Sequence, residues 1–216
     1  MSLTEKLAEL KAQNLAKIPK DAQKIMLADL EKLAKSDLVE NAPKQGDTLK
    51  DFTLPNHNGE TRHLATLRQN GPVVIIFYRG GWCPYCNMEL HAYQQALPDI
   101  KAAGATLVAI TPELPDASLT TAEKHGLEFE VLTDQNSTYA REIGIVFTLS
   151  QELRPIYTSF GIDIEGHNGK NQFDLPLAAT FVVDTNGTIA YAFVAADYTL
   201  RADPADVVKA LRSLKK

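Results

Sequence analysis

Residues 73–78 read Val-Val-Ile-Ile-Phe-Tyr, an uninterrupted apolar run of β-branched and aromatic residues. β-Branched and aromatic residues favour strands, and a run without alternating polar residues is typical of a central strand buried on both faces. Such a run is far shorter than the roughly 20 residues that cross a bilayer. The run therefore predicts a sheet covered by helices on both sides, which is an α/β fold.

Strand and helix patterns alternate after this run, as an α/β chain requires. Glycines end two of the helices, at positions 104 and 144. The last two strands flank a turn signal and are expected to add an antiparallel edge. The segment 147–174 has no clear pattern. The predicted elements are a hairpin of 51–54 and 61–64, helices 84–103, 118–125, 136–143 and one starting at Pro204, and strands 105–110, 129–132, 180–183 and 188–194.

Residues 1–45 are expected to form a helical extension ahead of a main domain that spans 46–216. Ser2 and Glu5 make a capping box for a first helix, and Pro19 separates it from a second amphipathic helix. A helix with an apolar stripe needs a partner, and the nearest is its own chain. We therefore expect these helices to pack on the main domain, with a dimer contact as the alternative.

The composition excludes several classes of protein. The chain is 44% hydrophobic and carries a net charge of −5, so it has a core but no basic excess for nucleic acid. Its first ten residues place charges where a signal peptide is apolar. Two cysteines are too few for a secreted disulfide scaffold. A cytoplasmic protein with no nucleic-acid or membrane partner is the expectation.

Both cysteines of the chain lie in one segment, Arg79-Gly-Gly-Trp82-Cys83-Pro84-Tyr85-Cys86, between a buried strand and a helix. This spacing at a helix start is typical of thioredoxin-like redox motifs. The free N–H groups of the first helical turn stabilise a thiolate, and Arg79 adds a positive charge. Inert packing and a zinc site are weaker alternatives, since a zinc site needs four ligands and the histidines show no ligand spacing. No metal or cofactor is expected.

Helix phase separates the roles of the two cysteines. Cys86 begins the stripe Cys86, Leu90, Tyr93, Leu97 and Ile100, which repeats at the spacing of a buried helix face. Cys86 is therefore expected to point inward. Cys83 is expected at the open mouth of the helix, as the exposed nucleophile.

The segment Phe77-Tyr-Arg-Gly-Gly-Trp-Cys-Pro-Tyr-Cys-Asn-Met-Glu89 resembles the active-site segment of peroxiredoxin-like proteins of the alkyl hydroperoxide reductase/thiol-specific antioxidant family. The similarity covers about residues 46–212 and includes Asp51–Leu54 with Asn58-Gly59, Gly104–Pro112, Ala179–Asp184 with Gly187, and Asp197–Ala202. It implies a thioredoxin-like fold with a central mixed sheet. It also implies reduction of a hydroperoxide substrate, with electrons from a thioredoxin-type protein or a small thiol, and leaves room for a homodimer.

Two positions depart from the family pattern. The family motif is Pro-x-x-x-Thr-x-x-Cys, often with a glutamate three residues later. Aligned on Cys86 with Glu89 as that glutamate, it places Arg79 at the proline and Cys83 at the threonine. This alignment makes Cys86 the peroxide-reactive residue, against the helix-phase argument, and the order of the two cysteines stays open.

The second departure concerns the cis-proline of the thioredoxin fold. Ala178 occupies its usual place, and the nearest proline is Pro176. A cis bond is expected at Leu175-Pro176 in preference to other positions.

Three functions fit these residues. The first is a thiol peroxidase that forms a Cys83–Cys86 disulfide, supported by Arg79, Trp82, Pro84, Tyr85, Glu89 and Pro176. The second is a thiol–disulfide oxidoreductase acting on protein disulfides. The third is a non-enzymatic redox sensor whose disulfide changes an interface.

Overall fold

The predicted central strand is β3 (Val73–Phe77) in the computed structural model, which describes residues 1–214. Positions 215–216, the last two of the predicted main domain, lie outside the described residues. The same sheet contains β4 (Thr106–Thr111), β5 (Glu130–Thr133), β8 (Ala178–Val183) and β9 (Ile189–Ala195). The strand order is β5-β4-β3-β8-β9, with β3 parallel to β4 and antiparallel to β8. A mixed sheet with an antiparallel β8–β9 edge confirms the predicted arrangement.

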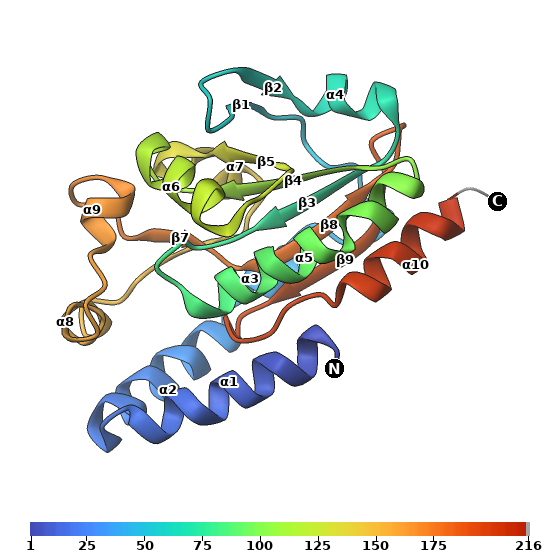
Figure 1. Cartoon of the computed structure of the whole chain (residues 1–216). Helices are drawn as coiled ribbons and strands as arrows, with labels where there is room; N and C mark the ends of the chain where they lie inside the picture. The colour runs from blue at the N-terminus through green and yellow to red at the C-terminus, as the bar shows by residue number, and fades with distance from the viewer. Residues whose placement is uncertain (215–216) are drawn as a thin grey trace.

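Alternate side chains of β3 enter two different cores, as the apolar run predicts. Val74 and Ile76 pack beneath α5 (Pro84–Ala102) and α10 (Pro204–Leu214), which lie side by side on one face (Figure 1). Ile75 and Phe77 face the other core, with α4 (Leu64–Leu67) and α7 (Thr138–Glu142). Helices on both faces of the sheet confirm the predicted fold class.

The remaining elements are short. The hairpin around Asn58-Gly59 is confirmed by the antiparallel pairing of its two strands, and the unassigned segment 147–174 contains two small helices. No helix within residues 1–214 is long and apolar enough to cross a membrane. These elements are β1 (Thr53–Pro55), β2 (Thr61–His63), β6 (Val146–Thr148), β7 (Asp174–Pro176), α6 (Pro115–His125), α8 (Leu153–Ser159), α9 (Ile164–Asn168) and the 3₁₀ turns Arg68–Asn70 and Gln135–Ser137.

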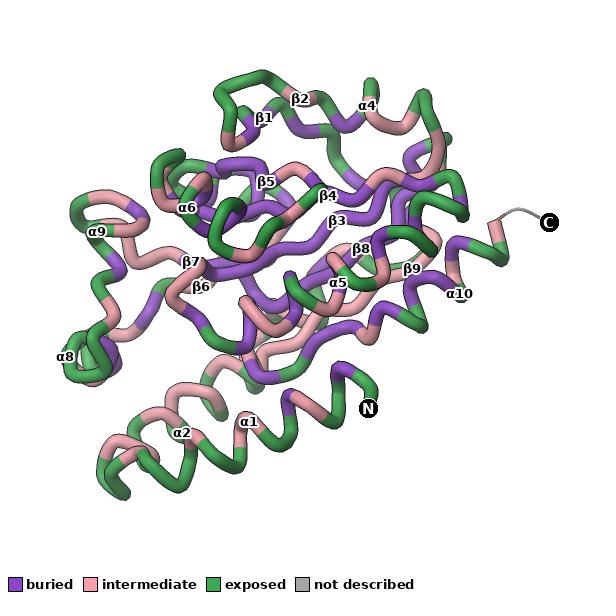
Figure 2. The backbone as a smooth tube through the Cα atoms, viewed as in Figure 1, coloured by how far each residue is buried: buried purple, intermediate pink, exposed green. Residues whose placement is uncertain are grey.

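The N-terminal segment forms α1 (Leu3–Lys17), α2 (Lys20–Ala34) and the unpredicted short α3 (Leu38–Asn41). The capping box is confirmed, because the Glu5 N–H donates to Ser2 Oγ and the Ser2 N–H donates to the Glu5 carboxylate. Leu3 and Leu7 of α1 are buried in the core beneath α5, whereas α2 has no buried residue (Figure 2). Met26 of α2 is partly buried and packs against the small core around α8. Both helices therefore contact their own chain, while a domain boundary at residue 45 stays a prediction.

Candidate functional site

The first turn of α5 places both cysteines, as the sequence predicts. Cys83 is the N-cap, Pro84 is the first helical residue, and the Asn87 N–H donates to the Cys83 carbonyl at 3.0 Å. Proline suits this position because it has no N–H that would need an acceptor. Cys86 then falls one turn into the helix, on the same side of the helix as the buried stripe.

The loop before Cys83 is held by a buried carboxylate. Glu113 Oε1 accepts the Gly81 N–H at 3.0 Å and lies 2.7 Å from His167 Nδ1. A Cβ at Gly81 would lie 2.1 Å from Thr121 Oγ1, so only glycine fits this close approach. The carboxylate and the glycine together fix where the chain enters α5.

Cys83 is fully buried, and the prediction that it is exposed is wrong. The sulfur accepts a hydrogen bond from Arg79 Nη2 at 3.1 Å, and Arg79 Nη1 donates to the Tyr157 hydroxyl at 3.0 Å. The guanidinium also lies over the rings of Trp82 and Tyr198, at 5.0 Å and 4.1 Å from their centroids. Residues far away in the sequence therefore cover the helix mouth, which helix phase could not reveal.

Cys86 points inward, as predicted, and its whole stripe through Ile100 is buried. Its sulfur accepts a hydrogen bond from Arg201 Nη2 at 3.2 Å, and Arg201 Nε donates to Glu89 at 2.5 Å. Burial raises the pKa of Glu89 to about 8, although Arg201 opposes that shift. Each cysteine sulfur thus accepts a hydrogen bond from a different arginine, Cys83 from Arg79 and Cys86 from Arg201.

The two thiols have pKa values shifted in opposite directions. Burial by itself raises the pKa of Cys83, but the hydrogen bond with Cys86 and the charges of Arg79 and Arg201 outweigh it, and the pKa lies well below its usual value. Burial, the hydrogen bond to Cys83 and the Cys83 charge raise the pKa of Cys86 well above its usual value. Both cysteines are free thiols in this structure. The surroundings therefore favour the thiolate form at Cys83 and the thiol form at Cys86.

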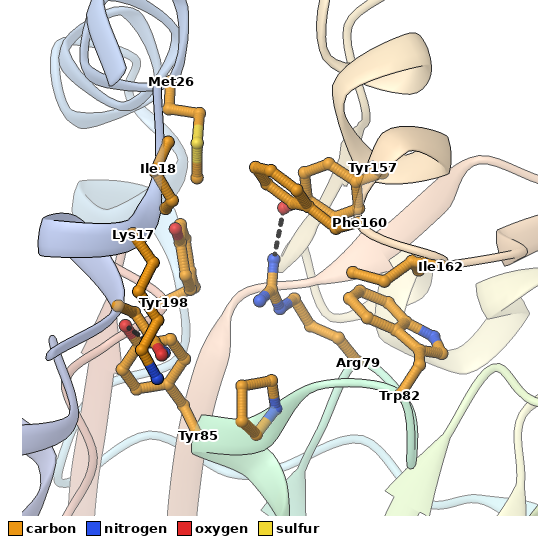
Figure 3. A pocket seen from close by; sticks show the side chains of 12 residues that line it. Lys17, Ile18, Met26, Arg79, Trp82, Tyr85, Tyr157, Phe160, Ile162 and Tyr198 are labelled. Carbon is orange, nitrogen blue, oxygen red and sulfur yellow. Dashed lines mark hydrogen bonds between the residues drawn. The ribbon is translucent and has the colours of Figure 1, made fainter. Parts of the chain in front are cut away.

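A cavity of about 320 Å³ lies over the Arg79 guanidinium (Figure 3). Trp82, Pro84 and Tyr85, all predicted as supporting residues, line it. Tyr85 also accepts a hydrogen bond from Asn14 of α1, 71 positions earlier in the sequence. Arg79, the arginine that contacts Cys83, therefore lines a cavity that solvent can enter.

Pro176 does not form the cis-proline that the sequence predicts. All peptide bonds in the described residues are trans, so the expected cis bond at Leu175-Pro176 is wrong. Pro176 is the last residue of β7 and pairs with Val146 of β6, which holds it in an extended strand. Ala178 opens β8 and pairs with Ala195.

Sequence reasoning missed several residues of this site. Arg201 lies in the Asp197–Ala202 stretch that carried the family resemblance, so that stretch was the available signal. Tyr157 lies in the segment 147–174, where no pattern was recognised. Glu113 follows a predicted strand, but nothing local indicates that its side chain turns toward the Gly81 loop.

Comparison with known proteins identifies the family. A Mycobacterium tuberculosis protein assigned to the peroxiredoxins is 31% identical over 123 residues, which are 56% of this chain and 80% of that relative. The peroxiredoxin Bcp of Escherichia coli (strain K12) is 28% identical over 105 residues, 49% of this chain and 67% of the relative. The crystal structure of peroxidoxin BcpB from M. tuberculosis covers 80% of this chain and 99% of its own, with a TM-score of 0.63 and 23% identity.

These similarities confirm the thioredoxin-like fold expected from the sequence. The family match spans residues 45–192, more than half of the chain, and contains both cysteines, Arg79 and Glu89. It leaves out α1, α2 and Arg201. The chain belongs to the AhpC/TSA family, the family of the peroxiredoxins.

Proposed function

We propose that this enzyme is a thiol peroxidase in which Cys83 attacks the peroxide and Cys86 resolves the product. The Cys83 thiolate attacks the terminal oxygen of a hydroperoxide, the O–O bond breaks, and the alkoxide leaves and takes up a proton as an alcohol. Cys83 is oxidised to a sulfenic acid by two electrons. The lowered pKa of Cys83 and its hydrogen bond from Arg79 support this role, because the thiolate is the reactive form.

Cys86 completes the first half of the cycle. Its sulfur attacks the Cys83 sulfenic acid, a disulfide forms, and the hydroxyl leaves as water with the Cys86 proton. The hydrogen bond between the two cysteine side chains supports a direct reaction. Two electrons from a thioredoxin-type protein or two small thiols then return the disulfide to the dithiol.

The burial of both sulfurs supports a peroxide as substrate over a protein disulfide. Cys83 and Cys86 are each 0% exposed, and the cavity of about 320 Å³ beside Arg79 has the size of a small molecule. A disulfide on a folded protein would have to approach the sulfur along the S–S axis, which this enclosure opposes. The hydrogen bond to Cys83 from Arg79, which itself lines that cavity, is the observation that carries the proposal.

The test is to trap the intermediate in Cys83→Ser and Cys86→Ser variants. Each variant is treated with one equivalent of hydrogen peroxide and dimedone, and the adducts are mapped by mass spectrometry. We expect the Cys86→Ser variant to carry the adduct on Cys83, the Cys83→Ser variant to carry none on Cys86, and the unaltered protein to form the disulfide.

An adduct confined to Cys86 in the Cys83→Ser variant would reverse the order of the two cysteines. Oxidation of the unaltered protein no faster than that of a free thiol would contradict the peroxidase function. Turnover of insulin disulfides with no response to peroxide would favour the disulfide oxidoreductase instead.

A further inference from the structure

The N-terminal helices form one wall of the cavity that leads to the catalytic arginine. The end of α1 contributes Asn14 and Lys17, the residue after it is Ile18, and α2 contributes Met26 (Figure 3). These residues precede position 45, where the family match begins. The wall therefore lies outside the part of the chain that matches the family.

The opposite wall is apolar and comes from the segment after β6. Phe160 and Ile162 line it together with Tyr157, whose hydroxyl accepts a hydrogen bond from Arg79. Figure 3 shows Ile18 and Met26 on one side of the guanidinium and Phe160 and Ile162 on the other. Arg79 thus lies between two walls that both present hydrocarbon side chains, and Lys17 adds a second cationic group on the N-terminal wall.

Specific contacts fix the N-terminal wall in this position. Asn14 Nδ2 donates to the Tyr85 hydroxyl at 3.3 Å, and Lys11 Nζ lies 2.8 Å from Asp197 Oδ2. The Gln23 amide donates to the carbonyl of Ile18 at 2.7 Å, which closes the turn between α1 and α2. Because these bonds hold the turn against the rim, the side chain of Ile18 faces the cavity at a defined place.

We propose that Ile18 and Met26 determine peroxide specificity by binding the apolar part of a bulky organic hydroperoxide. The inference rests on the proposed function, since the hydroperoxide group would lie at Arg79, next to the Cys83 sulfur. A ligand with an aromatic or branched alkyl group buries hydrocarbon against both walls and gains affinity in proportion to the area covered. Hydrogen peroxide has no such group and does not use the walls.

The experiment compares two double variants of the full chain. Ile18→Ala with Met26→Ala removes the apolar wall, and Leu15→Ala with Leu27→Ala removes solvent-facing side chains of the same helices, which are 42% and 57% exposed. Trp82, the only tryptophan of the chain, lines the cavity and reports oxidation by stopped-flow fluorescence. Rates are measured with hydrogen peroxide and with cumene hydroperoxide.

We expect the wall variant to react about 10-fold more slowly with cumene hydroperoxide and to keep its rate with hydrogen peroxide. The control variant should keep both rates. Equal changes for the two peroxides, or none, would overturn the inference while leaving the peroxidase function intact. Absence of a peroxide reaction in the unaltered protein would instead contradict the proposed function.

A binding measurement tests the wall without chemistry. Cumyl alcohol, the product of cumene hydroperoxide reduction, is titrated against the reduced protein while Trp82 fluorescence is followed. We expect the wall variant to bind it about 10-fold more weakly than the unaltered protein and the control variant to match the unaltered protein. Near-ultraviolet circular dichroism of each variant verifies the fold, and equal affinities in folded variants would overturn the inference.

Discussion

The Nη2 atom of Arg79 lies 3.1 Å from the Sγ atom of Cys83, and both side chains are buried. A buried thiolate lacks the water that would solvate it, so a guanidinium within hydrogen-bond distance replaces that solvation. Position 79 is a proline in the family motif aligned on Cys86. This chain therefore has a cation beside a second cysteine, where the family motif has a proline and a threonine.

Replacing Arg79 by methionine should raise the pKa of Cys83 and slow its reaction with peroxide at pH 7. Each unit by which the thiolate pKa rises above the working pH costs about 10-fold in the thiolate fraction. The pH dependence of Cys83 alkylation by iodoacetamide, followed by mass spectrometry, measures the shift in the pKa of Cys83.

Arg79→Lys should restore part of the thiolate fraction of Cys83. Arg141→Met, at an exposed arginine paired with Asp174, should leave the profile unchanged; an unshifted profile in Arg79→Met would contradict the role of Arg79.

Replacing Glu89 by glutamine should flatten the pH dependence of stability between about pH 5 and 8. The pKa of Glu89 is raised from 4.5 to about 8 in the folded state, so between these values the folded protein holds a proton that the unfolded chain has lost. The free energy of unfolding therefore falls as pH rises through this window, by up to about 1.4 kcal/mol per pH unit from this one group.

Urea unfolding of the reduced protein at pH 6 and pH 8 measures this contribution. The decrease in stability between the two values should be smaller in Glu89→Gln than in the unaltered protein. Glu152→Gln, at an exposed glutamate, is the control and should keep the decrease. Identical decreases in all three proteins would show that Glu89 ionises normally.

Replacing His167 by glutamine should destabilise the protein more at pH 6 than at pH 9. The hydrogen bond with Glu113 raises the pKa of His167, so the stabilisation from the charged pair is complete below about pH 6.5 and is lost as pH rises through the folded-state pKa. Because the His167 side chain is 35% exposed, we expect a loss of only about 1 kcal/mol at pH 6.

Thermal or urea unfolding of His167→Gln at both pH values checks this expectation. His91→Gln, at an exposed histidine of α5, is the matched control and should show no such difference. A larger loss at pH 9 than at pH 6 would mean that the neutral imidazole forms the stabilising pair.

Local sequence patterns predicted the elements that carry the cysteines. The run 73–78 has no polar residue, which indicates a strand with a neighbour layer on each face, and β3 is that strand. Pro84 and the stripe from Cys86 to Ile100 define a helix start and a buried face because helix geometry repeats within a few residues. The elements of the segment 147–174 were not predicted, because they are only three to seven residues long and are too short to show the hydrophobic period of a helix or strand.

The sequence by itself determined that two cysteines lie one helical turn apart at the end of a buried strand, because strand and helix formation depend on neighbours in the chain. Only the tertiary structure decided that Cys83 is buried, that Arg201 contacts Cys86 across 115 positions, and that α1 and α2 wall the cavity. These features depend on which surfaces meet when the chain folds, and a local pattern does not specify the partner of a side chain. The pKa difference between the two thiols follows from those contacts, since burial and neighbouring charges set it.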